Sequence, residues 1–523
     1  MTSRIDHLRG LMLRSRCSAA AKLVLGRNAA EARARFLTFL SAGCVLALAV
    51  LKLSGTESPA RVALEATLAL SFVCLSIVDF RASVAIAIFE LVLAGAGGHW
   101  ASYPLGITGR ILLEGVITVR ALSIIVGDWC RNGRLPLGRY GIHALMLAVL
   151  IPGIWIPLGL FNGNTPHDVV ADGNGFFSFA FVLVVVASAL RGHGDWFRKL
   201  FVAACGANGI VTLGMIVVSA TRWVALQPTM STDLLARLDM GGAIGYMPNG
   251  AYRLYLGSSL LLQVGLALTT WQLLSRPRRV WLWLLYAVFW IDLLATYSRG
   301  LWLAGVAAVI MVIALGSPTL KRAALVVGAT AMMWGFIAAG GALNGFSLRD
   351  YVFNRSATIV SLGPSPSKPK PSSKGKPSSK DVSGEVSNGM RVKQAKILFR
   401  YIKKRPVIGY GFGAVAKDWG PGYAFELSYL ALLFKTGIIG FLLYLSFPLR
   451  LLWDALRVRL GRRSPPQRMV PRDASVAFAI VASILFAGTS NPYLFAAFGI
   501  ISFLIAAAWL DDAEPQATAT SQA

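Results

Sequence analysis

The chain has 523 residues, of which 55% are hydrophobic and only 14% are charged, and its formal net charge is +27. Long apolar runs with so few charges exclude an ordinary soluble protein and predict an all-α, polytopic membrane helix bundle. A membrane β-barrel is excluded as well, because barrel strands alternate apolar and polar residues over segments of ~10 residues.

The apolar runs predict about fourteen transmembrane helices. Residues 1–35 are basic and predict a cytoplasmic N-terminus, and residues 36–343 hold about eleven of the helices. A long loop, 344–427, separates these helices from about three more in residues 428–510. The chain then ends in a predicted cytoplasmic tail, residues 511–523.

The distribution of Lys and Arg predicts the orientation. The short segments assigned to the cytoplasm hold 27 Lys and Arg residues, whereas the short segments assigned to the outside hold 6. This asymmetry follows the positive-inside rule. Both termini are therefore predicted to lie in the cytoplasm, and the loop 344–427 is predicted to lie outside.

The long outer loop divides into two parts. Residues 361–389 are rich in Ser, Pro, Lys and Gly, so they predict a disordered insert. A solvated linker is favoured there over a loose attractant for anionic glycan or phosphate. Residues 390–406 place apolar residues at helical spacing and predict an amphipathic helix that ends at Pro406. That helix either covers the outer face of the bundle or rests on lipid head groups. Its polar side comprises Arg391, Lys393, Lys396 and Arg400.

The candidate site is a group of cations and one carboxylate at the outer face. Glu426 begins a late span, and the cations are Arg253, Arg299, Arg355 and Arg391. Taken singly, an arginine there could reach lipid phosphate, and a glutamate at a helix start could simply suit the helix dipole. Together they suit a diphosphate, which guanidinium groups bind well, beside a carboxylate that could accept a proton from a sugar hydroxyl. No metal-binding motif and no nucleotide-binding domain are recognised in the sequence.

Charges inside the predicted spans form a rival site. They are Glu65, Glu90, Glu114, Arg120 and Asp292. A proton-coupled transporter would depend on such residues, because ionisable groups within a membrane are costly and commonly functional.

Four stretches in the second half of the chain resemble one known family. They are TYSRGLWLA (296–304), MRVKQAKILFRYIKKRPVIGYGFG (390–413), FELSYLALLFKTGIIGFLLY (425–444) and SNPYLF (490–495). In this order they resemble the O-antigen ligase/polymerase superfamily, the Wzy- and WaaL-like integral membrane glycosyltransferases.

The resemblance implies a glycosyltransferase of the bacterial inner membrane with a periplasmic active site and no cofactor. It implies a polyprenyl-diphosphate-linked glycan as substrate, with Arg299 and Arg391 on the diphosphate and a general base in the long loop. The lipid bilayer and a chain-length regulator are the other expected partners, and nucleic acid is not one.

One departure from the family bears on the reaction. Ligases of this family place a histidine, often His-Asn, where this chain has Glu426-Leu427, and the loop 344–427 contains no histidine. We therefore expect a polymerase of O-antigen, capsule or exopolysaccharide repeat units, inverting and metal-independent, with Glu426 as the catalytic base. Arg253, Arg299, Arg355 and Arg391 are the expected diphosphate ligands. A ligase acting on lipid A–core and a flippase or proton-coupled transporter are the alternatives.

Overall fold

The computed structural model describes eleven stretches of the chain, and within them the side chains of Arg253 and Arg299 are not described. The stretches are 31–48, 59–93, 108–220, 242–246, 252–296, 298–316, 318–343, 382–419, 425–461, 471–489 and 493–511.

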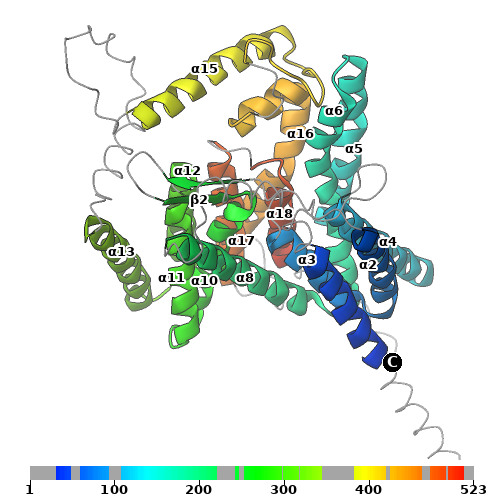
Figure 1. Cartoon of the computed structure of the whole chain (residues 1–523), viewed down its shortest axis with the longest axis horizontal. Helices are drawn as coiled ribbons and strands as arrows, with labels where there is room; N and C mark the ends of the chain where they lie inside the picture. The colour runs from blue at the N-terminus through cyan, green and yellow to red at the C-terminus, as the bar shows by residue number, and fades with distance from the viewer. Residues whose placement is uncertain are drawn as a thin grey trace, which may run out of the picture.

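Helices dominate the described residues, which confirms the all-α prediction (Figure 1). After a helix over residues 31–48, the first half contains α2 (Pro59–Val78), α3 (Phe80–Leu93), α4 (Gly109–Asn132), α5 (Arg139–Phe161), α6 (Pro166–Phe177), η2 (Ser178–Phe181), α7 (Val182–Leu190) and α8 (Gly194–Ala220). The second half contains β1 (Gly242–Tyr246), β2 (Tyr252–Leu256), η3 (Gly257–Ser259), α10 (Leu260–Ser275), α11 (Val280–Ala295), α12 (Arg299–Gly316), α13 (Leu320–Leu343), α15 (Val382–Lys404), α16 (Ser428–Arg459), α17 (Pro471–Ala487) and α18 (Ala497–Asp511).

Several of the described helices have the length and composition of membrane spans. Five are long and apolar enough to cross a bilayer: Ala60–Val78, Arg139–Phe161, Pro166–Leu190, Trp196–Ile216 and Ser428–Arg459. Shorter apolar helices are Val280–Ala295, Gly300–Gly316, Ala474–Ala487 and Ala497–Leu510. The chain is therefore a multi-pass membrane protein, while the total of about fourteen spans stays a prediction.

The centre of the bundle is formed by α17 and α18 (Figure 1). Helix α17 contacts α10, α12, α16 and α18. Ile480, Ile484 and Leu504 from these two central helices are almost completely buried. Helices that are apolar on every side can be buried in this way only when other helices surround them.

The hairpin of β1 and β2 is not predicted from the sequence, whose apolar runs indicate here only a loop followed by a transmembrane helix. The two strands are antiparallel, with Gly245 opposite Arg253. Leu254 and Leu256 are buried while Tyr255 between them is partly exposed. This alternation is that of a strand with one covered face, so the span begins only at Leu260.

Helix α15 also begins earlier than predicted. It starts at Val382, inside the segment that composition predicts as a disordered insert, and not at Met390. The last proline of that segment is Pro377. Between Pro377 and Pro406 no residue lacks a backbone N–H or clashes with a helical turn, so the helix can begin upstream of Met390.

Candidate functional site

Helix α15 lies across the N-terminal end of α16 (Figure 1). Its residues Ile397, Leu398 and Ile402 are buried at helical spacing in a cluster with Ala431 and Phe434 of α16. The opposite face of α15 is charged and exposed. The helix therefore rests on the protein, as expected for a cover over the end of the bundle.

The interface of α15 with the segment before α16 brings two predicted site residues together. Arg391 Nε donates to Glu426 Oε2 at 2.8 Å, although the residues are 35 positions apart in sequence. Their side chains are 33% and 58% exposed, so a substrate can reach both. Among the described residues, the other carboxylate oxygen of Glu426 and the terminal nitrogens of Arg391 have no hydrogen-bond partner.

Gln394 fixes the backbone beside this pair, a role that the sequence did not suggest. It lies one helical turn after Arg391 and is 2% exposed. Its Oε1 accepts a hydrogen bond from the Leu427 N–H at 3.2 Å. A polar side chain at a buried, apolar position of an amphipathic helix is the signal that could have identified it.

The other predicted cations lie on different elements. Arg299 opens α12, and Arg253 lies on β2, which contacts α11. Arg355 lies outside the described residues. The structure therefore joins Arg391 to Glu426, and it positions the backbones of Arg253 and Arg299 without describing their side chains.

The turn that leads to Arg299 is held by its own polar groups. Thr296 Oγ1 donates to Leu293 O at 2.7 Å, and Trp302 Nε1 donates to the same carbonyl at 2.7 Å. Trp302 N donates to Ser298 O at 3.0 Å, which marks the first helical hydrogen bond of α12. The first N–H groups of a helix have no intrahelical acceptor, so this end of α12 suits an anion.

The glycines in the stretch after α15 allow its backbone to pack directly against neighbouring helices. Gly409, Gly411 and Gly413 all have positive φ. A Cβ on Gly411 would lie 2.3 Å from Gly159 N of α5. Gly411 N donates to Lys435 O at 2.9 Å, so the loop backbone contacts α5 and α16 directly. Only glycine allows both the conformation and the close approach.

Helix α16 is broken where this loop meets it. Gly437 has φ 63° and ψ −172°, which interrupts the helix. Beyond the break, Ile438 N donates to Pro406 O at 2.8 Å and Ile439 N donates to Val407 O at 3.2 Å. The loop therefore supplies acceptors that the interrupted helix lacks, and it ties the C-terminal end of α15 to the bundle.

A buried ion pair anchors the same loop. Lys435 Nζ of α16 lies 2.6 Å from Asp172 Oδ1 of α6, and the two side chains are 4% and 6% exposed. Gly413 N donates to Asp172 Oδ2 at 2.6 Å. The rings of Phe425 and Phe495 lie 5.5 and 6.0 Å from the ammonium group. This pair was not predicted from the sequence, although a charged residue inside each of two helices was a signal for it.

Most of the rival charges inside the bundle have local partners. Glu65 pairs with Arg61 at 3.1 Å, Glu90 pairs with Arg110 at 3.6 Å, and Arg120 Nε donates to Ser76 O at 3.3 Å. Within the described part of the chain, Glu114 Oε1 and both carboxylate oxygens of Asp292 are buried without a hydrogen-bond partner. The five rival charges lie on four different helices. In the described residues, no group of three His, Cys, Asp or Glu side chains has the arrangement of metal ligands.

Comparison with known proteins gives one family. The family described as O-antigen ligase matches residues 284–445. This match covers most of α11, all of α12, α13 and α15, and the first part of α16. It includes Arg299, Arg391 and Glu426, and it leaves out Arg253 and Asp172. The comparison with curated proteins gave no match.

Proposed function

We propose that this chain, whose residues 284–445 match the O-antigen ligase family of membrane glycosyltransferases, polymerises polyprenyl-diphosphate-linked oligosaccharide units. The observation that carries the proposal is the exposed contact between Arg391 and Glu426, 2.8 Å apart, inside the matched segment. A cation for a diphosphate and a carboxylate for a hydroxyl proton are the two groups that such a transfer requires.

The proposed reaction is a single displacement at the anomeric carbon of the growing chain. A hydroxyl oxygen of the next lipid-linked unit forms the new bond to that carbon. The bond from the carbon to the diphosphate oxygen breaks, and diphosphate leaves on its polyprenyl carrier. Glu426 takes the hydroxyl proton. A direct displacement of this kind inverts the anomeric configuration.

Arg391 can serve both partners at once. Its Nε donates a hydrogen bond to Glu426, which holds the carboxylate in place. Its terminal nitrogens point elsewhere in the planar fork and are suited to the oxygens of the leaving diphosphate. Arg299, at the start of α12, is proposed as a further ligand of that diphosphate.

The rival transporter finds less support. Arg61 and Arg110 offset two of its carboxylates, and Arg120 is bonded to a backbone carbonyl of α2. Local pairing of this kind stabilises helix contacts and needs no transported ion to explain it. The pair Arg391–Glu426, in contrast, is exposed.

A ligase is the second candidate, favoured by the description of the matched family. Both reactions use the same donor chemistry and differ in the acceptor. Glu426 stands where ligases of the family have histidine, and this difference favours the polymerase.

The test is reconstitution of the purified full-length protein with lipid-diphosphate repeat units. A ladder of lengthening chains that disappears with Glu426→Gln, and remains with the matched α15 surface variant Lys403→Gln, supports the polymerase. Transfer only after addition of lipid A–core identifies a ligase. If folded protein forms neither of these products, the assignment of glycosyl transfer is wrong.

A further inference from the structure

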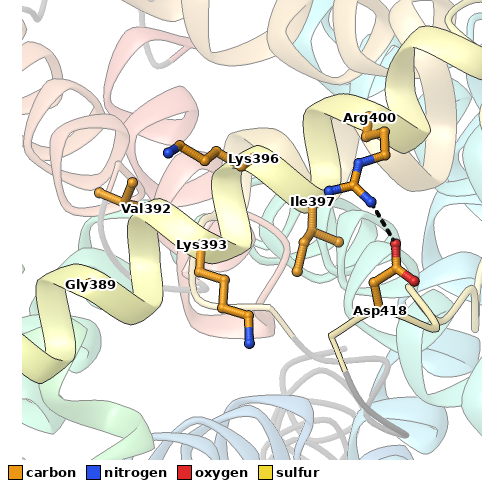
Figure 2. Close-up of a pocket in the computed structure, with 7 residues that line it drawn as sticks. All are labelled: Gly389, Val392, Lys393, Lys396, Ile397, Arg400 and Asp418. Atoms are coloured by element: carbon orange, nitrogen blue, oxygen red, sulfur yellow. Dashed lines mark hydrogen bonds and ion pairs between the residues drawn. The ribbon is translucent and has the colours of Figure 1, made fainter.

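A groove lies on the face of α15 that points away from the Arg391–Glu426 contact. Its volume is about 410 Å³, and its lining residues are Gly389, Val392, Lys393, Lys396, Ile397, Arg400 and Asp418. Figure 2 shows that all of these except Asp418 come from α15, with Asp418 reaching the helix from the segment that follows it. At 3.6 residues per turn, Lys396 and Arg400 lie about half a turn around the helix from Arg391.

The groove has an excess of positive charge. Three of its lining side chains are cationic, and Asp418 is the one acidic residue among them. Arg400 Nη1 lies 3.0 Å from Asp418 Oδ2, so this pair holds the guanidinium at the wall of the groove (Figure 2). Lys393 and Lys396 are exposed and form no ion pair with any described residue. Two uncompensated ammonium groups beside an oriented guanidinium attract anions.

The rest of the lining suits a sugar chain better than a lipid tail. Ile397 is 5% exposed and Val392 is 51% exposed, so the apolar surface is limited to small patches that can contact the C–H faces of sugar rings. A Cβ added at Gly389 would meet no atom within 4 Å, so that end of the groove is open. The other exposed apolar residues of this region, which suit a lipid surface, are outside the groove lining: Met390 and Phe399 of α15, and Val407 and Ile408 beyond its C-terminal end.

We propose that this groove binds a negatively charged stretch of glycan, through carboxylate or phosphate groups on its sugars. The inference rests on the proposed function and adds a substrate class to it: acidic repeat units. A chain with its reacting end at Arg391 and Glu426 would pass around α15 and place its acidic groups against Lys393, Lys396 and Arg400.

The test measures binding without any donor or turnover. Full-length protein in phosphatidylcholine nanodiscs is titrated with fluorescent hexagalacturonate, which is acidic, and with maltohexaose, which is neutral. The double variant Lys393→Gln/Lys396→Gln is compared with Lys403→Gln/Lys404→Gln, which removes the same charge from the same helix outside the groove. Thermal unfolding of all three proteins checks that the variants are folded.

The acidic oligosaccharide should bind the groove variant about five- to tenfold more weakly than the wild type, because each exposed charge pair contributes only modestly. The control variant should bind within about twofold of the wild type, and added salt should weaken all binding. Equal loss in both variants, equal binding of the neutral sugar, or no binding to the wild type would overturn the proposal.

A lipid source of the same anionic chemistry is tested by adding phosphatidylglycerol to the nanodiscs. If this lipid displaces hexagalacturonate from the wild type, the groove is a head-group site and the proposal is wrong. Undisturbed sugar binding supports the glycan. Failure of polymerisation with intact groove binding would overturn the proposed function alone, whereas polymerisation without groove binding would overturn this inference alone.

Discussion

Glu426 is the residue on which the proposed chemistry depends most. Its carboxylate is held by Arg391 through one oxygen, and the segment that carries it is held by Gln394 through the backbone of Leu427. Both supports come from one turn of α15. The position of the proposed base is therefore set by α15, and not by α16, which begins two residues after it at Ser428.

Replacing Glu426 with Gln keeps the size of the side chain and removes its ability to take a proton. We expect the rate of chain transfer to fall by ~10²- to 10⁴-fold, as is usual for loss of a general base. Single-turnover transfer with saturating lipid-linked donor measures this step. A variant that retains more than a tenth of the wild-type rate would contradict the role of Glu426.

Arg391→Ala should lower the rate by ~10²-fold or more, because the leaving diphosphate loses a charged donor. Arg391→Lys should recover only part of this, since an ammonium group cannot bond to Glu426 and to phosphate oxygens with one planar fork. Rates of the two variants at equal membrane levels provide the comparison. Full recovery by lysine would show that only the charge matters.

Gln394→Leu should leave α15 in place and loosen the Glu426 segment. A buried amide is exchanged for an apolar group of similar size, and the Leu427 N–H loses an acceptor, at a cost of ~1–3 kcal/mol. We expect a lower maximal rate with little change in donor binding. Separate measurement of kcat and KM distinguishes this from loss of a donor contact, which would raise KM.

At the scale of elements, the break in α16 and the glycine-rich loop form one unit. The loop fills the gap at Gly437, and the buried pair Asp172–Lys435 fastens it to α6. Helices α5, α6 and α16 therefore all contact the loop that follows α15.

Breaking the buried pair from one side should be costly. Lys435→Met or Asp172→Leu alone leaves an unpaired charge at a buried site, and each should lower stability by ~3–5 kcal/mol. The double variant should recover much of this loss, because it leaves no unpaired charge. Chemical unfolding in detergent gives the three values, and additive losses would show that the two residues are not coupled.

Gly411→Ala should destabilise the loop more than its backbone conformation alone explains. Gly461→Ala is the matched control, because Gly461 also has positive φ and a Cβ there would meet nothing within 4 Å. That control should cost ~1–2 kcal/mol. At Gly411 the added carbon would also lie 2.3 Å from Gly159 N, so the midpoint of thermal unfolding should fall further.

Element positions were largely predictable, and the contacts at the site were not. Apolar runs and the spacing of Ile397, Leu398 and Ile402 identified helices, because each helix shows its periodicity locally. The hairpin of β1 and β2 was missed, because strands of five residues give a weak signal beside a long apolar helix. The Lys435–Asp172 pair was missed, because its members are 263 positions apart and nothing local indicates that they meet.

At the scale of the whole molecule, the distribution of charge predicts which side of the membrane holds the site. In a variant whose five native cysteines are replaced by serine, Lys417→Cys, at an exposed position next to Asp418 of the groove, should react with a membrane-impermeant maleimide on intact cells. A cysteine in place of Arg457, near the opposite end of α16, should react only after the membrane is opened. The reverse labelling pattern would invert the predicted topology.

The Ser/Pro/Lys-rich insert has no part in the proposed reaction. Deletion of residues 364–377 should leave the rate of chain transfer within about threefold of the wild type, because a change in loop length costs only ~0.6 kcal/mol per doubling. The same reconstituted assay measures this variant. A loss as large as that of Glu426→Gln would give the insert a direct role.

Composition and short motifs were enough to indicate a helical membrane bundle that resembles the O-antigen ligase/polymerase superfamily, whose ligase family matches residues 284–445, and to include Arg391 and Glu426 among the candidate residues. Hydrophobic runs, charge and short motifs are local properties, so the chain displays them without its fold. Only the tertiary structure decided that Arg391 contacts Glu426, that Gln394 supports them, and that a basic groove lies on the other face of α15. Such contacts join residues far apart in the chain, and they depend on how the helices pack.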